Sequence, residues 1–120
     1  MADTPTNTPN TIPYDHFAQM EFRVGRITRA QEVPDADKLL RLEVDFGPYG
    51  ARQIISGIRA YFPDPAQLEG RHCVFATNLA PRVIRGLESQ GMILAAHNEE
   101  EGAFALLEVP PHIPPGTKIN

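Results

Sequence analysis

Apolar residues occupy every second position from Leu40 to Phe46, and charged residues fill the positions between them. This period of two predicts a strand with one face buried in a core and the other exposed to solvent. Shorter apolar runs of the kind found in strands cover residues 22–27, 52–56, 73–77, 92–96 and 103–107. The pattern therefore predicts an all-β chain of short strands separated by turns.

Other elements are predicted where the alternation is interrupted. The parity of the apolar positions changes at Gly25, which predicts a bulge that bends the first strand. Asp64 is suited to a helix N-cap and Pro65 to the first helical position, so we expect one very short helix over residues 64–70. A short helical turn is also expected at residues 14–17, before the first strand.

Five short strands with one short helix between the third and the fourth are typical of the OB-fold, a five-stranded Greek-key barrel that binds oligonucleotides. At 120 residues the chain is long enough for one domain with a substantial core, but not for two. Residues 1–11 are rich in threonine, proline and asparagine. We therefore expect a flexible tail there and a single domain over residues 12–120.

Net charge argues against a generic nucleic-acid binder, because the formal charge of the chain is −4. The charges are unevenly distributed, however. Ten of the eleven basic residues lie between Arg23 and Arg85, where only seven acidic residues occur, so this span carries +3. Three glutamates gather instead at residues 99–101. The sequence therefore permits a basic face on an acidic protein.

Catalytic and metal-binding chemistry is not indicated. The single cysteine, Cys73, lies in an apolar run, which excludes an internal disulfide and a cysteine-rich zinc site. The four histidines are isolated from one another, and Asp35 and Asp37 lack the further oxygen ligands that a calcium loop needs. No glycine-rich phosphate loop or nucleophile elbow occurs. We expect no enzyme, no metal and no cofactor.

The composition also favours a cytoplasmic protein. A lone cysteine inside an apolar run suits a reducing compartment. The chain has no basic-then-apolar leader and no apolar run long enough to span a bilayer, so no membrane association is expected.

Residues 78–91 form a basic connector between two predicted strands. The connector is too long for a tight hairpin, and Pro81, Gly86 and Gly91 are expected to break any helix or ladder through it. Arg82 and Arg85 lie three residues apart within it. Guanidinium groups grip phosphate oxygens in pairs of hydrogen bonds. From the residues alone, an ordinary solvated loop with two arginines is the slightly favoured interpretation, because two arginines in a loop are common.

The order of residues in the connector resembles the tRNA-binding domain family. The matching residues are Asn78-Leu79-Ala80-Pro81-Arg82, Arg85-Gly86 and Ser89-Gln90-Gly91-Met92. Residues 23–27, 34–39 with 44–45, and 56–58 also match in the same order, so the resemblance runs from about Phe17 to Ala96. The family includes the C-terminal appendage of bacterial methionyl-tRNA synthetases, free-standing tRNA-binding proteins and EMAP-II-like domains.

The resemblance implies an OB-fold with extra C-terminal strands, a homodimer built from chain-terminal segments, and tRNA as the partner, with an aminoacyl-tRNA synthetase as a further partner. The family reads the shape of tRNA, mostly the outer corner. Carried over to this chain, the RNA-binding set is Lys38, Arg41, Asn78, Arg82, Arg85, Ser89 and Met92. The cations would neutralise phosphates, and Asn78 and Ser89 would hold phosphate or 2′-hydroxyl groups. Met92 would contact a base or ribose, or would be a core residue of its strand.

A second reading remains open because Ala80 and Val83 stand where family members often carry lysine. The CsaA-like export-related chaperones resemble the same scaffold and bind unfolded polypeptide as dimers. Gly25 and residues 44–47 and 115–119 fit that group, whereas residues 34–38 and 85–92 favour the tRNA-binding branch. We therefore expect tRNA binding, with the chaperone function as the alternative.

Overall fold

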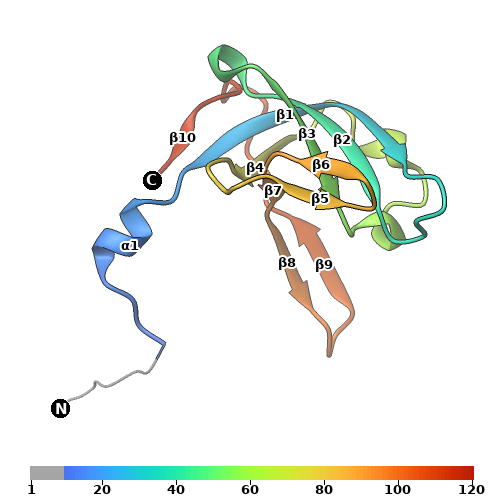
Figure 1. Cartoon of the computed structure of the whole chain (residues 1–120), viewed down its shortest axis with the longest axis horizontal. Coiled ribbons are helices and arrows are strands. Elements are labelled where there is room, and N and C mark those ends of the chain that lie inside the picture. The colour runs from blue at the N-terminus through green and yellow to red at the C-terminus, as the bar shows by residue number, and fades with distance from the viewer. Residues whose placement is uncertain (1–9) are drawn as a thin grey trace.

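The computed structural model describes residues 10–120, and its centre is a six-stranded sheet that curls into a half-barrel (Figure 1). Most of the tail expected at residues 1–11 lies outside the described residues. Five strands follow the order β3-β2-β1-β4-β7, and β10 pairs with β1 beside this path. The strands of the sheet are β1 (Phe22–Glu32), β2 (Leu40–Asp45), β3 (Ala51–Ser56), β4 (His72–Ala76), β7 (Met92–Ile93) and β10 (Lys118–Ile119).

The first strand, β1, joins both halves of the sheet. Its first residues pair with β4 and β10, and its later residues pair with β2. The register shifts between Ile27 and Arg29, so the predicted bulge exists but its predicted position at Gly25 is wrong. Gly25 instead allows close packing, because an added Cβ there would lie 2.5 Å from Val44 Cγ1.

The core lies inside the curled sheet and is built by the alternation seen in the sequence. Leu40, Leu42 and Val44 of β2 are fully buried, as predicted. Phe46 and Phe75 pack edge to face, with ring centroids 5.2 Å apart at 83°. Burying a side chain of this size stabilises a fold by about 1.5–3 kcal/mol. The packed core therefore stabilises the sheet on which the surface elements lie.

The helices are all short. The predicted turn before the first strand is the α-helix α1 (Tyr14–Ala18), and the predicted helix between the third and fourth strands is a 3-10 turn, η4 (Pro65–Leu68). The expected N-cap is confirmed, since Asp64 Oδ1 accepts a hydrogen bond of 3.2 Å from Ala66 N. Within residues 10–120 the remaining 3-10 turns are η2 (Gly47–Tyr49) and η3 (Arg59–Tyr61).

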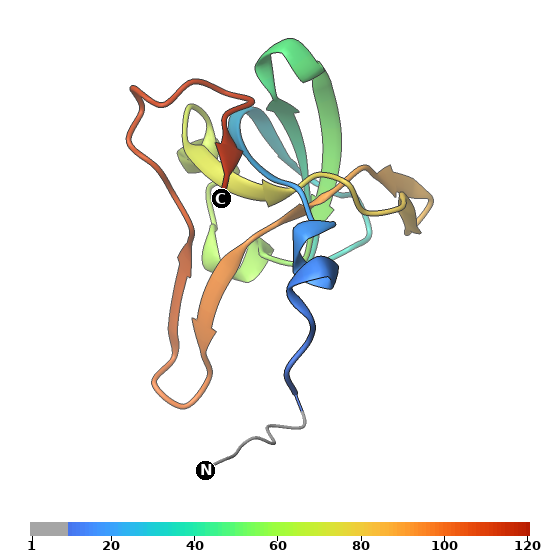
Figure 2. The same cartoon turned by 90° about the vertical axis from the view of Figure 1, so that its left-hand side faces the viewer.

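Two separate hairpins complete the fold. The first, β5 (Arg82–Ile84) with β6 (Leu87–Ser89), replaces the irregular connector that the sequence suggested. The second, β8 (Ala95–Asn98) with β9 (Ala103–Leu106), projects away from the half-barrel (Figure 2). The strand predicted at residues 103–107 is confirmed as β9. The strand predicted at residues 92–96 is instead divided between β7 and β8, which belong to different sheets.

Candidate nucleic-acid interface

The β5–β6 hairpin turns through only two residues, Arg85 and Gly86. Both have positive φ, 54° and 81°. Positive φ at both central positions is the backbone of a type I′ turn, whose twist matches the strands it joins. The connector as a whole is no tight hairpin between β4 and β7, as predicted, but the expectation that no ladder runs through it is wrong, because β5 and β6 pair within it. Arg82 stands at the start of β5 and Arg85 at the tip of the hairpin.

Hydrogen bonds hold the end of this hairpin against β3. Ser89 Oγ accepts a bond of 3.0 Å from Ile55 N and donates one of 3.0 Å to Gly91 O. Gln53 N donates to Gln90 Oε1 at 3.0 Å, and Gln90 N donates to Gln53 O at 2.8 Å. Ser89 is only 4% exposed. The hydroxyl of this predicted site residue therefore makes its hydrogen bonds with backbone groups inside the protein.

Asn78, another predicted site residue, also bonds within the protein. Its Oδ1 accepts a hydrogen bond of 2.8 Å from Glu21 N. Its Nδ2 donates to Gln19 O at 2.5 Å. The side chain thus ties the start of the connector to the segment that leads from α1 into β1.

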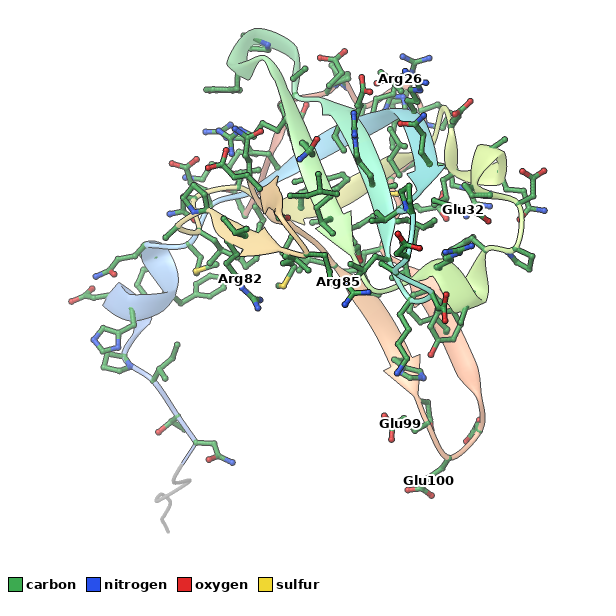
Figure 3. All side chains as sticks on the ribbon, turned by 45° about the vertical axis from the view of Figure 1, so that its right-hand side comes forward. Arg26, Glu32, Arg82, Arg85, Glu99 and Glu100 are labelled. Carbon is green, nitrogen blue, oxygen red and sulfur yellow. The ribbon has the colours of Figure 1, made fainter. Side chains whose placement is uncertain are left out.

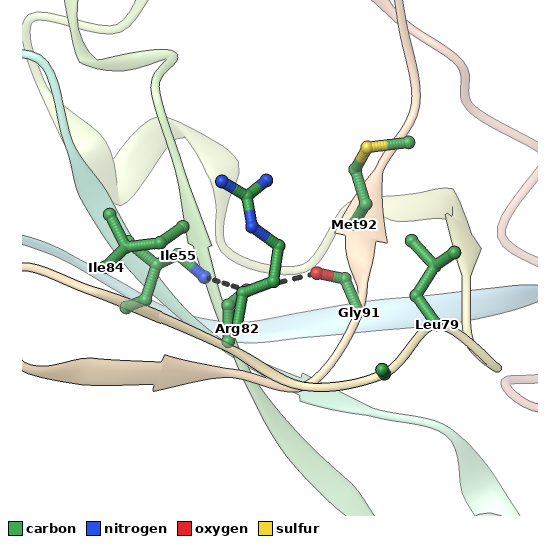
Figure 4. A pocket seen from close by; sticks show the side chains of 8 residues that line it. Ile55, Leu79, Arg82, Ile84, Gly91 and Met92 are labelled. Atoms are coloured by element: carbon green, nitrogen blue, oxygen red, sulfur yellow. Dashed lines mark hydrogen bonds between the residues drawn. The ribbon is translucent and has the colours of Figure 1, made fainter.

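Arg82 lies beside a small apolar hollow of ≈ 70 Å³. Figure 4 shows its guanidinium with Ile84 on one side and Met92 and Leu79 on the other. Met92 is 48% exposed, whereas its neighbour Ile93 is buried. Met92 is therefore a surface residue and not a core residue of its strand, and it lines the same hollow as Arg82.

Arg85 reaches across to the turn that carries Lys38. Its Nη2 donates a hydrogen bond to the backbone carbonyl of Asp35. A groove of ≈ 400 Å³ lies between the two segments, and both Lys38 and Arg85 line it. The structure therefore brings together cations that are 47 positions apart in the sequence.

Arg59 supports the Lys38 turn, and sequence reasoning missed it. Its Nη1 donates to Ala36 O at 3.1 Å, and its backbone N donates to Lys38 O at 3.3 Å. Its Nη2 also lies 3.1 Å from Glu32 Oε1 in an ion pair. No local pattern points to this role, because it depends on contacts between separate segments.

Arg41 lies on the outer face of β2 and is partly buried. In the strand register it stands opposite Ile55, a residue that also lines the hollow beside Arg82. Among the described residues its Nε is buried without a hydrogen-bond partner. The structure thus places Arg41 next to the hairpin region, with part of its guanidinium inaccessible.

Ion pairing separates the predicted cations from most other arginines. Within residues 10–120, carboxylates pair with Arg23, Arg29, Arg59 and Arg71, but not with Lys38, Arg41, Arg82 or Arg85. Figure 3 shows Arg82 and Arg85 pointing to the same side of the hairpin, with Arg26 at another part of the sheet. Unpaired cations therefore gather around the β5–β6 hairpin, where they can meet an anionic partner.

Cys73 is fully buried in β4. Burial, and then the negative charge of Glu108, raises the pKa of its thiol from 9.0 to about 12. The thiol is therefore protonated and unreactive at neutral pH. Across the described residues, no group of three or more metal-binding side chains is assembled, and no helix has the length and apolarity to cross a membrane.

The chain is similar to a known domain family. Residues 22–118 match the model of the tRNA binding domain family. A methionine–tRNA ligase of Xylella fastidiosa (strain M12) is 46% identical over 119 residues, which are 99% of this chain but only 17% of that enzyme. The chain therefore spans a small part of its curated relatives.

Two solved structures share the fold at nearly full length. A MetRS related protein from Pyrococcus horikoshii has a TM-score of 0.84 and 35% identity, covering 92% of this chain and 98% of that one. The chaperone CsaA of Bacillus anthracis has a TM-score of 0.79 and 31% identity, covering 92% and 99%. The similarity thus includes both the tRNA-related and the chaperone branches.

Proposed function

This chain belongs to the tRNA-binding domain family, and from that premise we propose that it binds folded tRNA through the surface around the β5–β6 hairpin, without catalysing a reaction. The observation that carries the proposal is the meeting of Lys38 and Arg85 across one groove, with Arg82 on the same hairpin. None of these side chains pairs with a carboxylate within residues 10–120. Their charge is therefore available to phosphates.

The side chains divide into contacting and supporting groups. Lys38, Arg82 and Arg85 neutralise phosphates, and Met92 offers an apolar contact to a ribose or base. Arg41 adds charge from the neighbouring strand. The hydroxyl of Ser89 and the amide of Asn78 fix the hairpin and its approach, since both already bond within the protein. We therefore reassign these two residues from RNA contacts to supports.

Shape, rather than base sequence, is the main feature that such a surface reads. Phosphate contacts set the position of a nucleic acid but carry no sequence information directly. A few cations around one hairpin therefore suit the irregular backbone of folded tRNA. Affinity is expected to fall with salt by about 0.7–0.9 log units per phosphate contact for each tenfold rise in salt.

A homodimer and a synthetase are the proposed protein partners, and the cytoplasm is the proposed location. The exposed apolar side chains Tyr14 and Phe17 of α1 border a groove of ≈ 170 Å³ that also includes Ile119 of β10. Chain-terminal segments of this kind can be covered by a second copy. An aminoacyl-tRNA synthetase is proposed because curated relatives carry the same domain within methionine–tRNA ligases.

Binding of unfolded polypeptide is the second candidate. It is favoured by exposed apolar side chains near Arg82, since Leu79 and Met92 line the hollow beside it and Val83, the next residue of β5, is 73% exposed. Such a mixed surface can accept apolar peptide side chains as well as RNA. The structural similarity to the chaperone CsaA adds to this candidate.

Filter retention of total tRNA at low salt, compared with anisotropy of a fluorescent unfolded peptide, tests the proposal. We expect saturable retention of tRNA that weakens as salt rises, and weak peptide binding. Strong peptide binding without tRNA retention would contradict the proposal and support the chaperone function. If the chain shows neither activity, the proposal is contradicted, and the domain is a dimerisation or scaffolding module.

A further inference from the structure

The groove between the Lys38 turn and the hairpin tip has a size and composition of its own. Its volume of ≈ 400 Å³ falls within the range of about 300–1,000 Å³ found for small-molecule sites. We call it the Lys38–Arg85 groove, and it is lined by Ala36, Asp37, Lys38, Leu39, Ile84 and Arg85. It therefore combines an apolar floor with charges of both signs.

The two cations are placed to hold a phosphate. Arg85 has five N–H donors, and within residues 10–120 only its Nη2 is used, by the carbonyl of Asp35. That bond fixes the guanidinium while its other donors stay open. The ammonium of Lys38 has no bond within residues 10–120. A phosphate between them would gain charge-assisted hydrogen bonds from both groups, and the guanidinium of Arg85 is already held in place.

The floor of the groove suits a flat, unpaired base. Ala36 is buried, while Leu39 and Ile84 are partly buried and contribute aliphatic surface. A base can also stack on the plane of an arginine guanidinium. Bases inside a duplex cannot enter such a groove, because their faces are covered by neighbouring pairs. A nucleotide in a loop, by contrast, can turn its base outward.

Asp37 gives the groove a chemical preference. Its side chain has no hydrogen bond or ion pair within residues 10–120. A carboxylate only accepts hydrogen bonds and can accept two at once. Guanine alone among the four bases presents two adjacent N–H donors, N1–H and the N2 amino group, on its Watson–Crick edge. Asp37 therefore favours guanine over adenine, cytosine and uracil.

We propose that the Lys38–Arg85 groove holds one unpaired guanosine nucleotide of the bound RNA. Lys38 and Arg85 hold its phosphate, Ile84 and Leu39 support its base, and Asp37 accepts hydrogen bonds from its Watson–Crick edge. This inference rests on the proposed tRNA binding. It adds a single base-specific contact to a surface that otherwise reads shape.

The test is a nuclear magnetic resonance titration of the isotope-labelled full chain with guanosine, inosine and adenosine monophosphates. We expect guanosine monophosphate to produce saturable shifts confined to residues 35–39 and 84–86. Inosine monophosphate, which lacks the N2 amino group, should bind more weakly, and adenosine monophosphate weakest. A guanine-over-adenine preference of about tenfold corresponds to about 1.4 kcal/mol.

Two variants and a control separate the base from the phosphate. Asp37→Asn should reduce the ratio of guanosine to adenosine monophosphate affinity to about threefold or less. A single bidentate pair between a side chain and a base supplies a ratio of roughly tenfold. Arg85→Gly retains the left-handed turn and should weaken all three nucleotides by a similar factor. Glu88→Gln, like Asp37→Asn, removes one negative charge, but from β6 outside the groove, and should keep the preference.

Three results would overturn the inference. These are equal binding of the three nucleotides, shifts outside the groove, or shifts with the unfolded peptide but with no nucleotide. If total tRNA is retained while guanosine monophosphate causes no shift, the groove proposal fails and the proposed function stands. If guanosine monophosphate binds but tRNA is not retained, the proposed function fails instead.

Discussion

Arg85 donates a hydrogen bond from its guanidinium to the backbone carbonyl of Asp35, and these are the two non-glycine residues with positive φ in the described part of the chain. The left-handed region is costly for most side chains and recurs at functional sites. Each residue occupies the tip of its own turn. The contact thus joins the two segments that carry the unpaired cations, at the residues whose backbones have positive φ.

Asp35 offers a test of how much strain its turn contains. Because φ is 62° at Asp35, Asp35→Gly should leave the free energy of unfolding unchanged or raise it. Asp35→Val should lower it by about 1–2 kcal/mol, since a β-branched side chain disfavours this backbone. Urea unfolding measures both. Equal stability of the glycine and valine variants would contradict a left-handed conformation at this position.

Arg59 is expected to act as a positioning residue for the Lys38 turn. Arg59→Met removes the bond to the Ala36 carbonyl, so the amide of Leu39 in this turn should exchange with solvent faster, by about fivefold for roughly 1 kcal/mol of lost support. Glu32→Gln, which alters only the ion pair, is the control and should have little effect. An unchanged exchange rate of the Leu39 amide in Arg59→Met would show that the turn is stable without the Arg59 side chain.

Ser89→Ala should destabilise the hairpin more than it weakens RNA contacts. The change leaves Ile55 N without its acceptor in a buried position, which costs about 1–3 kcal/mol. Ser56→Ala on β3 is the matched control, because within residues 10–120 the Ser56 hydroxyl has no bond. Thermal unfolding measures the difference. If Ser89→Ala keeps full stability but loses tRNA binding, Ser89 is a contact and not a support.

The burial of Cys73 predicts that the stability of the folded chain depends on pH in the alkaline range. Its thiol has a pKa of about 12 in the folded chain, against 9.0 for the ordinary thiol. The unfolded chain therefore loses this proton first, and the contribution of the neutral thiol to stability, full below pH 9.0, declines as pH rises toward about 12. The stability advantage of the unmodified chain over Cys73→Ala should shrink across that window. Urea unfolding of both proteins at each pH measures this difference. A difference in the free energy of unfolding that stays constant across this pH range would contradict the prediction.

The sequence predicted those parts of the fold that depend on local chemistry. The alternation from Leu40 to Phe46 predicted β2, because burial on one face leaves a period of two. Asp64 predicted the cap of η4, because a carboxylate before a proline suits a helix start. Both signals need only a few neighbouring residues.

The parts that were missed depend on distant contacts. The hairpin was unexpected because arginine is a rare first residue of a type I′ turn, and its conformation is accompanied by a bond to Asp35, 50 positions away. The burial of Ser89 follows from the way β6 docks on β3, which no local pattern encodes. Gly25 was assigned to a bulge because close approach of Val44 cannot be read from the first strand alone.

The salt dependence of tRNA binding tests the central claim most directly. The double variant Arg82→Ala/Arg85→Gly should fold normally, bind total tRNA more weakly, and show a slope of log affinity against log salt that is shallower by about 1.5, at roughly 0.7–0.9 for each lost phosphate contact. Arg26→Ala, which removes an exposed arginine elsewhere on the sheet that has no carboxylate partner within residues 10–120, should keep the original slope. Identical slopes for the double variant and the unmodified chain would contradict tRNA docking on the β5–β6 hairpin.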